Sequence, residues 1–184
     1  MLDIAPRHIG DTDDKRDSLA DRRPYPQTRG VSVSILPFRP DHAAAWAALN
    51  EAWLAEGGFA VEAKDRKVID DPRGAILRLG GRIFMAERAG EAIGCCALMA
   101  MDDGGFEVAK MTVSPAARGL GLGRRLLETC EAAARAAGAP RLYLETSSTL
   151  KPAGALYRSF GFVDLPPRPS PYVRADVWME KRLR

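Results

Sequence analysis

A glycine-rich segment, Gly119-Leu-Gly121-Leu-Gly123, constrains the fold most, because it lies between a predicted strand and a predicted helix. The first amides of a helix have no partner within it and carry partial positive charge. Glycines let the backbone approach a bulky anion and adopt positive φ. The flanking Arg118 and Arg124 can add charge-assisted contacts. The segment is therefore suited to holding phosphate oxygens.

Two other interpretations of the glycines stay open at this point. The dinucleotide fingerprint G-x-G-x-x-G has its third glycine one residue later than Gly123, and it follows its strand almost directly. Here about five residues separate the strand end from the glycines, although Glu145 mimics the ribose-binding acid of that fingerprint. The third interpretation is a glycine-rich turn that only begins a helix.

Hydrophobic periodicity predicts one mixed α/β domain over residues 31–184. Strands are predicted at 31–35, 83–87, 92–101, 106–113, 141–145 and 172–180. Helices are predicted from Pro40-Asp41 to Gly57-Gly58, over 120–137 and over 152–160, with one or two short helices before Gly81, the second starting at Asp71-Pro72. The sheet is expected to be mostly antiparallel, followed by one strand–helix–strand crossover. Residues 1–30 are rich in Asp, Arg and Pro and predict a flexible N-terminal extension.

Composition excludes several classes of function. The net charge of +3 and the lack of a dense Lys/Arg block argue against nucleic acid as a partner. No segment approaches the roughly 18 apolar residues of a membrane span, and the N-terminus lacks a secretory pattern, so we expect a cytoplasmic protein without a membrane partner. The three cysteines form no CxxC pair, and His8 and His42 have no ligand-like spacing, so neither a metal site nor a disulfide framework is expected.

Two motifs in order give the chain a family resemblance. Val113-Ser-Pro115 precedes Arg118-Gly-Leu-Gly121-Leu-Gly123, and Ala155-Leu-Tyr157-Arg-Ser-Phe-Gly161-Phe162 follows after a helix and a strand. From Glu107 to Phe162 the chain thus resembles the GNAT family of N-acetyltransferases, whose motifs are R/Q-x-x-G-x-G/A and L-Y-x-x-x-G-F. The resemblance implies a GNAT-like acyl-CoA N-acyltransferase fold in which two central parallel strands, here 106–113 and 141–145, splay apart.

The resemblance also implies acetyl-CoA as co-substrate, bound in the cleft between these two strands. Backbone groups along 111–113 would pair with the pantetheine arm, and amides along 118–124 would hold the pyrophosphate. The implied cofactor-binding residues are Met111, Thr112, Val113, Arg118, Gly119, Leu120, Gly121, Leu122, Gly123 and Arg124.

The family reaction is direct attack of an amine on the thioester, which agrees with the lack of a Ser/His/Asp or Cys/His arrangement here. Tyr157 matches the family tyrosine that often protonates the departing sulfur; the alternative is a core tyrosine packed through its ring. Glu107 is the candidate base. Strand alternation predicts that it shares a face with Ala109, Met111 and Val113, where apolar neighbours raise a carboxyl pKa. A solvated strand-end glutamate, with a water chain as base, is the alternative.

One position departs from the family pattern. Leu150 stands where many members have an asparagine seven residues before the tyrosine, so cofactor contacts on that side are in doubt. Glu145, Thr146 and Ser147, at the adjoining strand end, could supply polar groups instead.

The acceptor stays open: a small or amino-acid-like amine is favoured over a peptide N-terminus or a lysine side chain. Candidate residues at its entry are Trp46, Trp53, Phe59 and Tyr172, each of which could equally be a core or surface aromatic. The family is often homodimeric, and the sequence does not settle the oligomeric state. A non-catalytic acetyl-CoA-binding module is the alternative function, and a dinucleotide-dependent oxidoreductase is a weaker third hypothesis.

Overall fold

The computed structural model describes residues 32–183, so the extension predicted at 1–30 lies outside the described residues. The described residues contain one seven-stranded sheet. Its strands follow the order β1 (Val33–Pro37), β2 (Arg82–Arg88), β3 (Glu91–Ala100), β4 (Phe106–Val113), β5 (Arg141–Thr146), β7 (Val177–Arg182) and β6 (Val163–Leu165). Only β4 and β5 pair in parallel; the other neighbours are antiparallel. This confirms the predicted mixed α/β fold with a central parallel pair.

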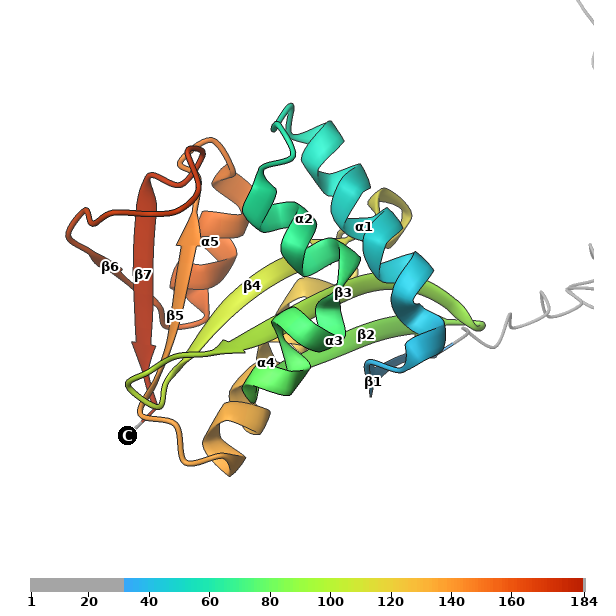
Figure 1. The fold of residues 1–184 in the computed structure, drawn as a ribbon, viewed down its shortest axis with the longest axis horizontal. Helices are drawn as coiled ribbons and strands as arrows, with labels where there is room; N and C mark the ends of the chain where they lie inside the picture. Colours follow the sequence, from blue (N-terminus) through green and yellow to red (C-terminus); the bar gives the residue numbers. More distant parts are fainter. Residues whose placement is uncertain (1–31, 184) are drawn as a thin grey trace, which may run out of the picture. The chain divides into compact units, whose positions relative to one another are not determined.

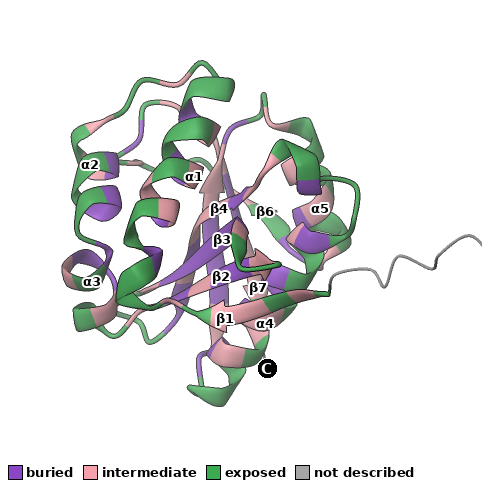
Figure 2. Ribbon diagram, turned by 90° about the vertical axis from the view of Figure 1, so that its right-hand side faces the viewer, coloured by how far each residue is buried: buried purple, intermediate pink, exposed green. Residues whose placement is uncertain are grey.

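Helices cover both faces of the sheet (Figures 1 and 2). One face carries α1 (Ala43–Glu56), α2 (Ala63–Asp70) and α3 (Pro72–Ala75), and the other carries α4 (Leu122–Ala136) and α5 (Lys151–Ser159). Short 3-10 turns lie at Pro40–His42, Leu77–Leu79 and Pro115–Ala117. No helix among residues 32–183 combines the length and the apolar character that a membrane crossing requires.

The sheet separates two clusters of buried apolar side chains. Trp46 of α1 and Val68 of α2 pack with β2 and β3 on one side. On the other side, α4 contributes Leu126, Leu127, Cys130 and Ala134, all fully buried. The helix ends one residue before the predicted 137, because Ala137 is the C-cap of α4 and is exposed.

An extra residue in β4 interrupts its alternation at Lys110. Cys95 pairs with Thr112 and Ala97 with Ala109, so two steps along β3 match three along β4. Lys110 itself has a φ of 51°, in the left-handed region that non-glycine residues rarely adopt. Glu107 therefore faces the α1 side with Ala109 and Thr112.

Met111 and Val113 instead pack against the cluster on the α4 side. The predicted common face of Glu107, Met111 and Val113 is wrong for this reason: strict alternation assumes an unbulged strand.

The central parallel pair separates soon after it forms. Only Phe106 with Leu142 and Glu107 with Tyr143 are in register between β4 and β5. Beyond them β4 turns toward the α1 side while β5 continues beside β7, which Figure 1 shows as diverging ribbons. The predicted splay is confirmed.

The C-terminal strand was predicted too early. Residues 172–176 form an irregular segment, and β7 begins only at Val177. Tyr172 and Arg174 pack their side chains against α2 and β4 instead of entering the sheet. The three-residue β6 is too short to show periodicity, and it was not predicted.

Candidate active site

The larger cavity lies where the end of β4, the glycine loop and the starts of α4 and α5 meet. Its volume is about 630 Å³. The C-terminal end of α1, with Trp53, Glu56 and Gly57, forms part of the wall. Nine of the ten predicted cofactor-binding residues line it, namely Met111, Thr112, Val113, Arg118, Gly119, Gly121, Leu122, Gly123 and Arg124. Leu120 is not in the wall and is 63% exposed.

The glycine loop has the backbone geometry of an anion cradle. Gly119 and Gly121 have φ values of 75° and 72°, a conformation that a side chain would strain. Gly121 is the N-cap of α4, which places the helix start two residues after the predicted Leu120. No described side chain caps α4, so its first amides can serve an anion in the cavity.

The arginines near the loop already have protein partners. Both terminal nitrogens of Arg118 donate to the Glu56 carboxylate, one at 2.5 Å, and its Nε donates to the Val113 carbonyl at 3.3 Å. This exposed pair links the loop to α1. Arg124 donates to the Ser159 hydroxyl at 2.8 Å.

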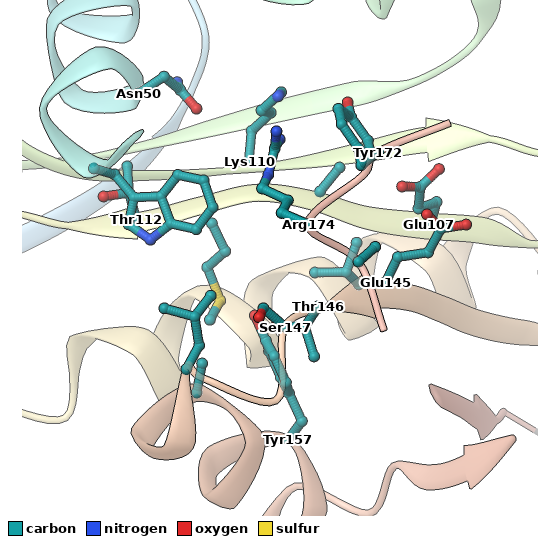
Figure 3. Close-up of a pocket in the computed structure, with 17 residues that line it drawn as sticks. Asn50, Glu107, Lys110, Thr112, Glu145, Thr146, Ser147, Tyr157, Tyr172 and Arg174 are labelled. Atoms are coloured by element: carbon teal, nitrogen blue, oxygen red, sulfur yellow. The ribbon is translucent and has the colours of Figure 1, made fainter. Parts of the chain in front are cut away.

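A smaller cavity of about 130 Å³ continues from the larger one between the splayed strands (Figure 3). The two share Trp53, Met111, Thr112, Leu150 and Ala153 as wall residues. Tyr157 and Glu107, the two candidate catalytic residues, both line the smaller cavity. The splay of β4 from β5 therefore brings them to one chamber, Tyr157 from α5 and Glu107 from β4.

A buried carboxylate that sequence reasoning missed organises the wall of the smaller cavity. Asp65 of α2 is fully buried and accepts hydrogen bonds from Arg174, at 2.7 and 2.9 Å, and from Lys110. Arg174 also donates to Glu62 at 3.0 Å. Burial alone would raise the pKa of Asp65, but the bonds from Arg174 and Lys110 outweigh it and lower the pKa.

Of the four aromatic residues predicted at the acceptor entry, two line the smaller cavity and two do not. Trp53 and Tyr172 line the smaller cavity. Phe59 packs on Trp53 with ring centres 5.5 Å apart and is not in the wall. Trp46 is a core residue whose indole donates to the Val68 carbonyl at 3.2 Å.

The family model described as the acetyltransferase (GNAT) family matches residues 41–162, more than half of the chain. The chain belongs to this family. It is accordingly an acetyltransferase, and the family uses acetyl-CoA.

Relatives of several kinds agree. An IAA acetyltransferase of Azospirillum brasilense is 44% identical over 107 residues, which cover 55% of this chain and 68% of that protein. The uncharacterized N-acetyltransferase YjgM of Escherichia coli (strain K12) is 37% identical over 86 residues, covering 45% of this chain and only 52% of YjgM.

Solved structures resemble this chain over most of its length. An acetyltransferase of the GNAT family from Staphylococcus aureus Mu50 has a TM-score of 0.76 at 18% identity, covering 83% of this chain and 100% of that one. That likeness concerns the fold alone. The yncA protein of Salmonella typhimurium, solved with its cofactor acetyl-CoA, has a TM-score of 0.68 at 26% identity, covering 83% and 95%.

Within this GNAT domain, the phenol of Tyr157 is buried at the smaller cavity. Its ring packs edge-on against Phe162, with centres 5.9 Å apart, and the residue is 8% exposed. Burial raises the pKa of Tyr157, with Cys96 adding to the effect, so the phenol keeps its proton at neutral pH. In Figure 3 its side chain rises from α5 toward Ser147.

Glu107 has the raised pKa that its apolar surroundings predict. Burial is the main cause; Lys64 opposes it, Glu145 adds to it and Lys110 opposes it. Glu145 itself accepts a hydrogen bond from the Tyr143 hydroxyl at 3.0 Å and another from Ser170. A carboxylate that gains a proton easily suits proton removal from an ammonium group.

The departure at Leu150 is visible in the walls. Leu150 lines both cavities with an apolar side chain and precedes α5 without capping it. The three polar residues expected to compensate, Glu145, Thr146 and Ser147, all line the smaller cavity. Ser147 shares a hydrogen bond of 2.9 Å with the Thr149 hydroxyl.

The described part of the chain shows no cluster of metal-ligand side chains and no exposed cysteine. Residues 32–183 contain no group of three or more His, Cys, Asp or Glu side chains that could hold a metal ion. The three cysteines are free and buried, and burial raises the pKa of Cys95.

We expect Asp65→Asn to lower the free energy of unfolding by about 3–5 kcal/mol, because Lys110 and Arg174 would lose their buried counter-charge. The lowered pKa means that Asp65 stabilises the fold above its unfolded pKa and loses that contribution as pH falls through the folded one. Urea unfolding at pH 7 and below pH 4 measures both effects. Asp70→Asn, on the exposed side of α2, is the matched control; equal effects of the two variants would contradict the role of Asp65.

Proposed function

We propose that this acetyltransferase moves the acetyl group of acetyl-CoA directly to the amine of a small, amino-acid-like acceptor. The observation that carries the proposal is the continuity of the two cavities, one beside the glycine loop and one holding Tyr157 and Glu107. Residues 31–184 would form the whole catalytic domain. The cytoplasmic location stays a prediction.

The residues present fit acetyl-CoA. The positive φ of Gly119 and Gly121 and the uncapped amides of α4 suit a pyrophosphate. Beyond Glu107, the edge of β4 that faces β5 is free of strand pairing, so backbone groups of Met111 and Val113 can pair with a pantetheine amide. Bound there, acetyl-CoA supplies an activated thioester.

The reaction needs three actions that the smaller cavity can provide. Glu107 takes the proton of the acceptor's ammonium group, directly or through water. The amine nitrogen forms its bond to the acetyl carbon as the carbon–sulfur bond breaks. Tyr157 donates its hydroxyl proton to the departing sulfur and regains a proton, through solvent, as the nitrogen loses its second one. The polar groups at 145–147 line the side where Leu150 offers none.

The cofactor site is tested by Gly121→Glu. A side chain at φ 72° strains the loop, and a carboxylate there repels phosphate, so acetyl-CoA binding by calorimetry should be lost. Gly104→Glu is the matched control, because Gly104 also has a positive φ, 79°, and lies in the exposed β3–β4 turn. Retained binding in Gly121→Glu would place the cofactor elsewhere.

Catalysis is separated from binding by Tyr157→Phe, which keeps the packed ring. We expect kcat for CoA release to fall about 100-fold or more, with little change in the Kd for acetyl-CoA. An unaltered kcat would remove Tyr157 from the chemistry. Binding of acetyl-CoA without CoA release for any amine, in the unaltered protein, would favour the alternative of a non-catalytic acetyl-CoA-binding module.

The base is tested by the pH dependence of kcat/KM. Because Glu107 must be deprotonated to act and its pKa is raised, activity should fall on the acid side at a higher pH than an ordinary glutamate gives. Glu107→Gln should remove this limb and lower kcat/KM about 100-fold. Glu128→Gln, exposed on α4, should leave the profile unchanged. An acid limb that persists in Glu107→Gln would assign proton removal to a water chain.

A further inference from the structure

Charges of opposite sign lie on different sides of the smaller cavity (Figure 3). Lys110, at the bulge of β4, and Arg174, from the segment before β7, form a cationic side. Glu107 and Glu145, on the two splayed strands, form an acidic side. Figure 3 shows the two carboxylates together and apart from the two cationic side chains. A cavity with one cationic side and one acidic side is complementary to a small molecule that carries a negative and a positive group.

The cationic side keeps hydrogen-bonding capacity for a ligand. Lysine has three donors and arginine five. Arg174 uses Nη1 and Nη2 on Asp65 and Glu62, and Lys110 donates to Asp65. Among the described residues, Arg174 Nε has no acceptor, and Lys110 Nζ has no second one. Both side chains are held in place, while Arg174 Nε and the remaining donors of the Lys110 ammonium stay available.

Three cationic side chains gather on this side of the cavity. Lys64 joins Lys110 and Arg174 around Tyr172, with distances to the ring centre of 4.6, 5.1 and 4.3 Å. Their direct ion pairs are with Asp65 and Glu62, of which Asp65 is fully buried, and Lys64 and Lys110 also act on the Glu107 carboxylate. A carboxylate entering the cavity therefore meets preorganised donors in a site shielded from water.

We propose that the acceptor is a small amino acid whose carboxylate binds Lys110 and Arg174 while its amino group faces Glu107 and Glu145. The inference rests on the proposed function and narrows its acceptor. A cavity of about 130 Å³ suits a small molecule. A peptide N-terminus and a lysine side chain within a chain both lack a carboxylate beside the reacting amine, so this site disfavours them.

A panel of acceptors tests the carboxylate directly. The full-length protein is assayed for CoA release from acetyl-CoA with the twenty amino acids, their carboxamides and their decarboxylated amines. We expect at least one amino acid to exceed its amide and its amine by about tenfold to 100-fold in kcat/KM, mainly through KM, because charge-assisted bonds are lost without the carboxylate. Equal turnover of acid, amide and amine would overturn the inference and leave the proposed function standing.

Two variants test whether Lys110 and Arg174 cause the preference for an acceptor with a carboxylate. In Lys110→Met the ratio of acid to amide should fall toward one through a higher KM for the acid, whereas Lys67→Met, exposed on α2, should keep the ratio. If Lys110→Met does not unfold in a single cooperative transition, the acid-to-amide ratio is measured in Arg174→Gln instead. The comparison of acid, amide and amine in the unaltered protein requires neither variant. Equal losses for acid and amide in both variants would reduce the pair to a structural role and overturn the inference.

Failure of the proposed function has a different signature. In that case acetyl-CoA does not bind by calorimetry, or it binds and no amine of any class releases CoA, and the inference falls with it. Release of CoA with amines or amides but with no amino acid contradicts the inference alone.

Discussion

The bulge at Lys110 shifts by one residue the alternation of β4 between the two faces of the sheet. Odd-numbered Glu107 and Ala109 face α1 before the bulge, whereas odd-numbered Met111 and Val113 pack toward α4 after it. A non-glycine residue at φ 51° costs on the order of 1–3 kcal/mol, and the bond from Lys110 to buried Asp65 helps to offset it. The free backbone edge, the candidate base Glu107 and the cation Lys110 thus all come from the eight residues of β4.

The separation of β4 from β5 determines what chemistry the fold can host. A parallel strand pair that helices cover on both faces normally stays hydrogen-bonded along its length and leaves no opening between the strands. Here only two residue pairs stay in register, and the open wedge joins the glycine loop to Glu107. In the proposed function, the start of α4 and the free edge of β4 bind the two ends of one elongated ligand, and its thioester lies near Glu107 and Tyr157.

Short-range sequence patterns predicted the glycine loop, β4 and the helix that carries Tyr157. Glycines at a helix start, an eight-residue strand and the motif around Tyr157 each carry a short-range pattern, so Phe106–Val113 and the loop were placed correctly. The bulge has no such pattern, because Lys110 resembles any polar strand residue. The partnership of Asp65 with Arg174 joins positions 109 apart in the chain, and charged pairs leave no periodic trace. Tyr172 and Val173 favour strands by propensity, and tertiary contacts overrode it.

One carboxylate, Asp65, holds together three segments that are distant in the chain: α2, the middle of β4 and the segment before β7. Under the proposal that Lys110 and Arg174 bind the acceptor, fold stability and acceptor recognition depend on the same charges. During divergence, a change at any one of these positions would destabilise the fold before it could alter specificity. New acceptor preferences in descendants of this chain should therefore arise through simultaneous, compensating replacement of Asp65, Lys110 and Arg174. They could otherwise arise at Glu145 and Ser170, where exchange does not disturb the buried carboxylate.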